Sequence, residues 1–440
     1  MDSYEQGLIK DMAGQLARVK RTNRVKGQYY EGTHEVVNVG FNVPEKMRSQ
    51  APHIGWAGIV VDALEERIQF LGWNDPSGKL GLDRVYAVNQ LSVESGLAHF
   101  DSFIYGTGFV EVGSGETETD QPLVSIESSQ TMTGVWDHRM RRLSAALRLN
   151  PTVKGEPDRG SLFLPDETIS LVKDGGQWRD EERDIHRLGV VPVVMMPNRI
   201  SASSRLGHSE ISRPICDLVD EAGRVLLAMG VNREFFSGPQ RVVMGATPDD
   251  VEGWKTITAA LWTIEADDDG NLPKIETFPQ VEAGPHIEQL KALATQTASV
   301  AGIPETYFGV SATANPSSAD AIRASEVRLI KKAERRCQML GMAWLNVAKL
   351  VCLVRDGTIP PGFADVSCRW ADPATPTSAA KADEASKLVG AGILPASSRV
   401  TLDRIGLSDA EQQQVATDRA VNPTLADVIA ASATRQTSEA

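Results

Sequence analysis

The chain has 440 residues, of which 41% are hydrophobic and 23% are charged, and its mean hydropathy is −0.21. These values are typical of a folded globular protein of two or three domains, and they exclude a disordered chain or a membrane-spanning one. The net charge of −13 argues against a protein that grips nucleic acid by neutralising phosphates, because that mode of binding needs a basic surface.

The N-terminal third is expected to alternate helices with strands. Its first fifteen residues, "MDSYEQGLIKDMAGQ", lack the apolar core of a signal peptide, so we expect a protein that stays inside the cell that makes it. Helical spacing of apolar residues predicts an amphipathic helix over 53–73, ending at Gly72, and a second helix over 83–106.

A series of short β-branched or alternating runs follows, broken by Gly, Pro, Asn and Asp. The runs are "GFVEVG", "QPLVSIES", "SAALRLN", "GSLFLPDETISLVK" and "LGVVPVVMMPN". They predict a mostly antiparallel sheet. The last of them is the longest apolar run in the chain and is too short to span a bilayer.

The apolar period changes to helical at Ser209, which we expect to cap a helix that runs to 236. Residues 238–283 are strand-like and turn-rich, with one short helix, "TPDDVEGWKTITAAL", that starts at Thr247. A helix is predicted again over 284–303, where Pro304 stops it.

The longest predicted helix runs from Ser317 to about Arg355, without an internal proline, behind the small-residue loop "VSATANPSSAD". At 1.5 Å per residue its length is about 55 Å, too long to be buried on all sides in a chain of this size. A strand-like run, "ADVSCRWADP", and Ala-rich helices over 375–393 and 396–420 follow. The last twenty residues are expected to be disordered or weakly helical.

No catalytic or metal-binding motif stands out. The four cysteines form no CxxC pair, so we expect reduced thiols without a disulfide or zinc, and the seven histidines lie singly. Gly106 and Gly108 lack the third glycine of a dinucleotide-binding loop. Asp267 and Asp269 resemble the start of a calcium loop, but the twelfth position is Phe278, and a hairpin turn is the better interpretation. We therefore predict no catalytic residues, no metal, no cofactor and no enzymatic activity.

A cationic cluster stands out in this acidic chain, at the start of the longest predicted helix. Its members are Arg323, Arg328, Lys331, Lys332, Arg335 and Arg336. One interpretation is a solvated helix face tied by intrahelical pairs with Glu326 and Glu334. The other is a set of ion pairs between subunits, or of passing contacts with phosphates.

The sequence resembles the portal proteins of tailed double-stranded DNA bacteriophages over nearly its whole length. The segments that carry the resemblance are "VVDALEERIQFLGW", "LAHFDSFIYGTGFVEV", "VPVVMMPNR", "SEISRPICDLVDEAGRVLLAMGVNREFFSGPQRVVMG" and "AGIPETYFGVSATANPSSADAIRASEVRLIKKAERR". Their order and spacing together are more specific than any one of them.

The resemblance implies an α+β portal fold in a ring of about twelve subunits. Its parts would be a wing (1–207), a stem helix (208–237), a clip (238–283), a second stem helix (284–303), a tunnel-loop region (304–319), a long helix with a return strand (320–374), a crown (375–425) and a tail (426–440). The tunnel loop that faces DNA would include Thr313, Ala314, Asn315, Pro316, Ser317 and Ser318. The clip residues that dock partners would include Thr247, Asp249, Asp250, Trp254, Asp267, Asp268 and Asp269.

The resemblance also implies partners and a location. The ring would sit at one capsid vertex of the virion after assembly in the host cytoplasm, and it would contact the major capsid protein, head–tail adaptor proteins, the terminase large subunit and double-stranded DNA of any sequence, but no membrane. A small-residue loop on a rigid helix suits contact with moving DNA, since it has little bulk. Two alternatives stay open at this point: a nucleic-acid-modifying enzyme, and another capsid-associated adaptor.

Overall fold

In the computed structural model, the described residues are 1–36, 43, 51–115, 121–150, 152, 157–236, 241–244, 274–277, 283–309, 319–407 and 409–421. The chain divides into two compact units, Met1–Pro373 and Ala374–Ala440. Helices and antiparallel strands occur together in the first unit, which confirms the predicted α+β class at that level.

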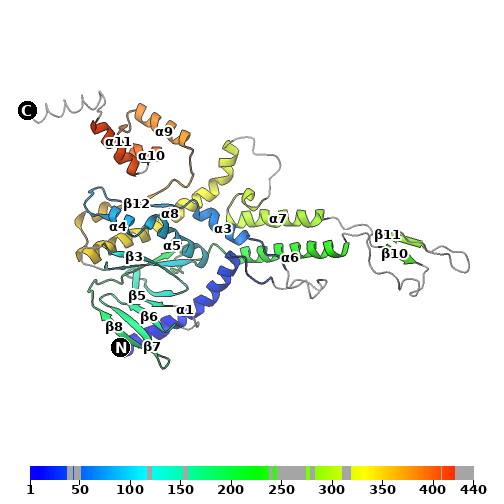
Figure 1. Cartoon of the computed structure of the whole chain (residues 1–440), viewed down its shortest axis with the longest axis horizontal. Helices are drawn as coiled ribbons and strands as arrows, with labels where there is room; N and C mark the ends of the chain where they lie inside the picture. The colour runs from blue at the N-terminus through cyan, green and yellow to red at the C-terminus, as the bar shows by residue number, and fades with distance from the viewer. Residues whose placement is uncertain are drawn as a thin grey trace, which may run out of the picture. The chain divides into compact units, whose positions relative to one another are not determined.

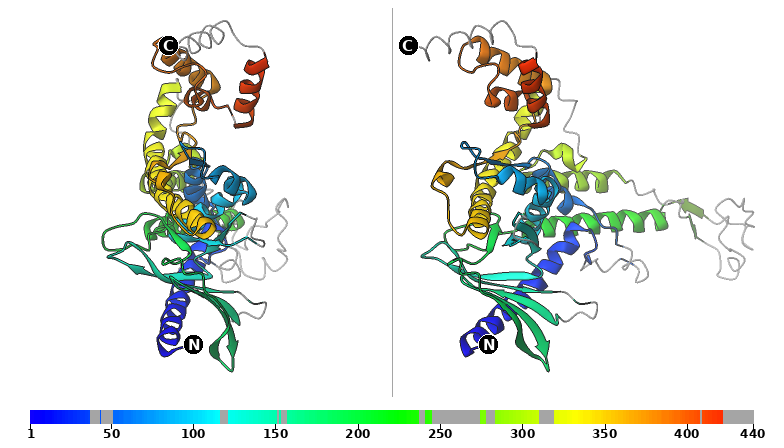
Figure 2. Two further views of the ribbon diagram at one scale, coloured as in Figure 1. Left: turned by 90° about the vertical axis from the view of Figure 1, so that its left-hand side faces the viewer. Right: turned by 60° about the vertical axis from the view of Figure 1, so that its left-hand side comes forward.

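The N-terminal helix α1 (Ser3–Tyr30) begins with a capping box, in which Asp2 accepts from the backbone of Glu5 and Glu5 accepts from the backbone of Asp2. Its buried residues Ile9, Met12 and Leu16 recur at helical spacing and share a core with the five-stranded sheet. Figure 2 shows this helix lying along the sheet.

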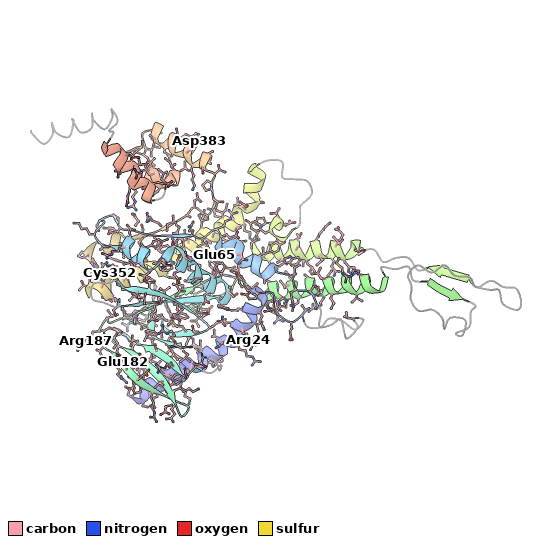
Figure 3. The ribbon with its side chains drawn as sticks, viewed as in Figure 1. Arg24, Glu65, Glu182, Arg187, Cys352 and Asp383 are labelled. Carbon is pink, nitrogen blue, oxygen red and sulfur yellow. The ribbon has the colours of Figure 1, made fainter. Side chains whose placement is uncertain are left out.

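The five-stranded sheet is antiparallel, with strand order β4-β5-β6-β7-β8. Its strands are β4 (Met132–Asp137), β5 (Arg142–Leu149), β6 (Arg159–Phe163), β7 (Thr168–Asp174) and β8 (Gln177–Asp184). Strand β8, which carries Glu182 (Figure 3), is one of the two edge strands and is almost wholly exposed. Its charges protect the open edge against pairing with another chain.

A three-stranded antiparallel sheet has the order β3-β2-β9, from β3 (Leu123–Ser128), β2 (Thr107–Gly113) and β9 (Val193–Pro197). Phe109 and Met195 of this sheet pack with Phe163 of the five-stranded sheet in a shared apolar core. The predicted antiparallel sheet is therefore confirmed, but it is divided into separate sheets.

The largest core is formed by helices around the small sheet of β1 (Phe70–Asn74) and β12 (Ser367–Trp370). The helices are α3 (Trp56–Glu65), α4 (Leu82–Val88), α5 (Leu91–Tyr105) and α8 (Ala319–Asp356). At its centre Trp344 stacks on Phe70 with 4.7 Å between ring centroids. Trp344 Nε1 donates to His99 Nε2 over 3.0 Å, and the Trp344 carbonyl accepts from Trp73 Nε1.

Helix α8 confirms the predicted long helix and has 38 residues. Among the described residues, its portion Ala324–Asp356 is the one stretch that is long and apolar enough to cross a membrane by length and composition. A core helix of a soluble protein passes the same test, and Leu329, Leu340 and Trp344 are buried on its inner face. The apolar face that α8 turns to the core therefore explains why its length and composition resemble those of a membrane-spanning helix.

Helices α6 (Arg213–Phe236) and α7 (Gly284–Ala301) pack side by side (Figure 1). Asn232 near the end of α6 lies 2.7 Å from His286 near the start of α7, so the two helices are antiparallel. Between them in sequence, β10 (Arg241–Met244) and β11 (Lys274–Thr277) pair antiparallel. The short helix η2 (Glu305–Phe308) follows α7, and η3 (Pro361–Asp365) follows α8.

The second unit contains α9 (Ser378–Gly390), α10 (Arg399–Ile405) and α11 (Asp409–Val421). Thr377 and Ser398 accept backbone hydrogen bonds at the starts of α9 and α10. The predicted helix over 396–420 is thus two helices, because the chain turns at Gly406 with a φ of +93°.

Two further helix predictions are wrong in part, one at its end and one in its middle. The predicted helix over 53–73 stops at Glu65, and its last residues form β1, since Phe70 and Trp73 pair with the distant strand β12. The predicted helix over 83–106 is broken between α4 and α5 at Gln90, which has a φ of +49°. In both cases contacts remote in sequence or a local backbone turn override the apolar spacing.

All four cysteines are free; Cys337 and Cys352 are buried, and Cys216 and Cys368 are half-buried. Cys352, labelled in Figure 3, lies on the buried face of α8. They pack as small apolar side chains.

His99 gives a testable pH dependence. Its complete burial lowers its pKa from 6.5 to about 3. Because the unfolded chain binds a proton below pH 6.5 and the folded chain does not, this histidine lowers folding stability as the pH falls from 6.5 towards 3, by up to about 1.4 kcal/mol per pH unit. We expect His99→Gln to remove this part of the slope, measured by urea denaturation at pH 7, 6 and 5.

The comparison with wild type is needed because Glu65 changes the folding stability with pH in the opposite direction. Burial raises the pKa of Glu65 to about 7, so the folded chain holds that proton more firmly than the unfolded chain. The two proteins share this residue, and its effect cancels in the difference. Equal pH slopes for wild type and His99→Gln would contradict the prediction.

Candidate functional site

The segment between β9 and α6 folds back onto the end of α5 and forms an elbow. Asn198 N donates to the Gly106 carbonyl over 2.8 Å, and Glu210 N donates to the Phe103 carbonyl over 2.9 Å. Gly207 lies inside this turn with a φ of +77°, and a Cβ there would collide with the backbone of Gly106 and Asn198. Only glycine fits this position without rearrangement.

The elbow corrects the predicted helix start. Helix α6 begins at Arg213, and Ser209 does not cap it. Ser209 Oγ instead donates to the Ile104 carbonyl and accepts from Ile211 N, which fastens the elbow to α5. The result is that Glu210 is turned towards the start of α8.

Glu210 is the centre of a buried ion-pair network. Its side chain is 3% exposed, and its two oxygens lie 2.7 Å from Lys332 Nζ and 2.8 Å from Arg336 Nη2. Asn198 Nδ2 donates to the same carboxylate over 3.0 Å. Burial raises the pKa of Glu210, but Lys332 and Arg336 outweigh it and lower the pKa to about 2. The carboxylate is therefore charged at neutral pH.

Side chains on the same face of α8 also donate hydrogen bonds to the carbonyls at the end of α7. Arg328 Nη1 donates to the Ser299 carbonyl over 2.9 Å, and Lys332 Nζ donates to the Ala301 carbonyl over 3.2 Å. The carbonyls in the last turn of a helix have no partner within it and carry partial negative charge, so cations there satisfy and stabilise them. Helix α7 then ends at Gly302, with a φ of +71°.

These groups surround a hollow of about 740 Å³ between the start of α6, the end of α7 and α8. We call it the basic hollow. Its charged residues are Glu210 and the six cations Arg199, Arg328, Lys331, Lys332, Arg335 and Arg336.

Five of the six cations predicted as a cluster line this hollow, and the side chain of Arg323 lies outside the described part. The interpretation as a helix face tied by intrahelical pairs applies in part. Lys331 pairs with Glu334 along the helix at 2.7 Å, but Glu326 pairs with Arg67 instead, at 2.8 Å. Lys332 and Arg336 are used within the chain, because they pair with Glu210.

The other predicted site residues lie outside the described residues. They are the tunnel-loop residues Thr313, Ala314, Asn315, Pro316, Ser317 and Ser318, and the clip residues Thr247, Asp249, Asp250, Trp254, Asp267, Asp268 and Asp269.

Sequence reasoning missed Glu210, Asn198 and Arg199. One signal was available, since Glu210 is the only acidic residue between Asp184 and Asp217. An isolated acid between apolar and serine-rich segments is a candidate for a specific buried pair.

A tyrosine, a histidine, an aspartate and a cysteine lie close together where α1 contacts α6. Tyr29 donates to Asp220 over 2.9 Å and stacks on His34, and Cys216 lies nearby. An activated cysteine needs a lowered pKa, but burial raises the pKa of Cys216 to about 11. Among the described residues no group of three potential metal ligands lies together. This cluster ties two helices and offers no nucleophile.

Comparison with known proteins decides the family. The family profile described as "Phage portal protein, SPP1 Gp6-like" matches residues 13–420. The chain belongs to this family of phage portal proteins. It is 32% identical over 410 residues to the "Portal protein" of Mycobacterium phage D29, a match covering 89% of this chain and 84% of the relative. It is also 32% identical over 405 residues to the "Portal protein" of Mycobacterium phage L5, covering 88% and 82%.

A solved structure titled "Neck of native GTA particle computed with C12 symmetry" resembles this portal protein weakly. The TM-score is 0.46 and the identity 14%, over 83% of this chain and 94% of the other.

Family membership confirms the function predicted from the resemblance. The protein is a portal protein of a tailed phage, a head–tail connector located in the virion. Portal proteins are structural components of the capsid and not enzymes, so the alternative of a nucleic-acid-modifying enzyme is not supported. Nor is the alternative of a separate adaptor.

Proposed function

We propose that this portal protein closes into a ring of about twelve copies around a channel for double-stranded DNA of any sequence. In this proposal residues 1–207 form the wing, α6 and α7 are the stem, 238–283 is the clip that docks the terminase large subunit and later the head–tail adaptors, and 375–425 is the crown. The ring sits in a capsid vertex made by the major capsid protein, after assembly in the host cytoplasm.

The observation that supports the ring is the apolar surface that one chain leaves uncovered. Val93 and Leu97 are four residues apart on α5 and are 68% and 51% exposed, and Met342 on α8 is 71% exposed. Residues i and i+4 share a helix face, so the α5 pair is a continuous apolar strip. In a closed ring each copy uses two different surfaces, and strips of this kind are covered by neighbours.

The channel is assigned to the segment in front of α8. Residues 313–318, "TANPSS", carry no charge and little bulk, and they precede a helix of 38 residues whose inner face is packed in the core. Uncharged small side chains on a stiff support neither hold phosphates nor read bases, as passage of any sequence requires.

The mass of the assembly tests the ring. We expect the purified protein to run near twelve times 47.6 kDa in light scattering, and electron micrographs to show annular particles with a central hole. A protein that stays monomeric at every salt and protein concentration tried would overturn the proposal.

A further inference from the structure

The basic hollow has more positive charge than its own carboxylate balances. Six cations against one carboxylate, Glu210, leave a net charge of +5 at its wall. The whole chain has a net charge of −13, so this concentration is opposite in sign to the average surface. Such a patch attracts an anionic group from outside the chain.

The cations differ in whether groups of the same chain already form ion pairs or hydrogen bonds with them. Lys332 and Arg336 are half-buried and held by Glu210. Arg199 and Arg328 donate to main-chain carbonyls, which carry no net charge. Among the residues that the structure describes, Lys331 forms an ion pair only with its helical neighbour Glu334, and Arg335 forms none.

The start of α6 adds to the positive potential. Ser212, Pro214 and Ile215 line the hollow, and the first turn of α6 contains no acidic residue to offset the positive end of the helix dipole. Val300 and Pro214 give the hollow an apolar floor as well. The cations can therefore pair with the carboxylate of an Asp or Glu side chain, while the apolar lining contacts the methylene groups of that side chain.

We propose that the basic hollow receives an acidic segment of a second copy of this chain, so that Lys331 and Arg335 pair with its carboxylates across the subunit interface. This rests on the ring of the proposed function and names one of its contacts. The size favours protein over DNA, since a hollow of about 740 Å³ has the volume of a small-molecule pocket and takes a few side chains but not a duplex. A second copy of the chain can supply the carboxylates, because 58 of the 440 residues are Asp or Glu.

Charge reversal tests the contact. The double variant Lys331→Glu/Arg335→Glu places two repelling charges at the interface and leaves Glu210 and its partners intact. We expect the protein concentration at half-assembly to rise by at least about tenfold at low salt, with a smaller difference at high salt, where exposed charges are screened. The matched control is Lys349→Glu, which reverses an exposed charge of the same helix outside the hollow and should assemble as wild type does.

A second measurement does not depend on the folding of a variant. Rings assembled from a mixture of ¹⁴N- and ¹⁵N-labelled wild-type copies are treated with a carbodiimide, which joins a lysine amine to a carboxylate in contact with it. Mass spectrometry should find Lys331 joined to an Asp or Glu peptide of the other isotope, which identifies the carboxylate and proves that it comes from another copy.

The outcomes separate this inference from the proposed function. If wild type does not assemble, the ring itself is wrong. If wild type assembles and the double variant assembles equally well, or Lys331 is joined only to Glu334 of its own copy, the inference is overturned and the ring stands. Salt-dependent binding of a 30-base-pair duplex that the double variant loses, with assembly unchanged, would show that the hollow serves DNA and would likewise overturn it.

Discussion

Glu210→Ala should destabilise the folded chain by about 3–5 kcal/mol. Removing this carboxylate leaves Lys332 and Arg336 with their charges largely buried and uncompensated, and leaves Asn198 without its acceptor. Breaking a buried ion pair by removing one partner is costly for this reason, even where the intact pair contributes little. The measurement is urea denaturation at one fixed protein concentration, because assembly adds to the apparent stability.

The control for this prediction lies on the same helix. Glu334→Ala removes the partner of Lys331 from an exposed pair and should cost less than about 1 kcal/mol. Equal losses for the two variants would contradict the assigned role of Glu210.

The ion-pair network also has a pH signature. The pKa of Glu210 is lowered from 4.5 to about 2, so its stabilising contribution is complete above pH 4.5 and is lost as the pH falls through about 2. The stability difference between wild type and Glu210→Gln should therefore shrink over that interval.

Trp344→Ala should also cost about 3–5 kcal/mol. The ring is fully buried, stacks on Phe70 and donates to His99. Truncation removes this buried apolar area and leaves a cavity in the largest core, where α8, α5 and the β1–β12 sheet meet. Denaturation under the conditions used for Glu210→Ala gives the value.

Two variants divide the effect into packing and hydrogen bonding. Trp344→Phe retains an aromatic ring against Phe70 but leaves His99 Nε2 without its donor, and should lose about 1–3 kcal/mol. Lys349→Ala changes an exposed side chain of the same helix, and should stay within about 0.5 kcal/mol of wild type. A loss for Lys349→Ala as large as for Trp344→Ala would contradict the assigned position of the core.

The sequence predicted several helices that have one apolar face, because burial of that face sets both the pattern and the structure. It did not predict α1, whose buried apolar residues Ile9, Met12 and Leu16 lie on a mostly polar helix. Helix α8 was placed to within two residues at its start, and α7 stops at Gly302 close to the predicted end. Strand β8 was missed because its exposed, charged residues have no apolar alternation to detect.

Two of the failures of prediction are caused by contacts that are remote along the chain. Phe70 joins a strand because Trp370, three hundred residues later, lies beside it. The basic hollow was predicted only as a row of cations, since nothing local to α8 indicates that Glu210 lies against Lys332 and Arg336. That juxtaposition depends on how the elbow after β9 folds onto α5, through a turn that requires glycine at position 207.

The burial of the four thiols has a consequence for the life of the particle. A virion persists outside its host, in medium that contains dissolved oxygen, and the thiolate is the form of cysteine that oxidises. Burial raises the pKa of Cys337 and Cys368 to about 12 and that of Cys352 above its ordinary value. In the folded protein these three thiols are therefore kept mostly in the protonated form, which reacts slowly with oxidants.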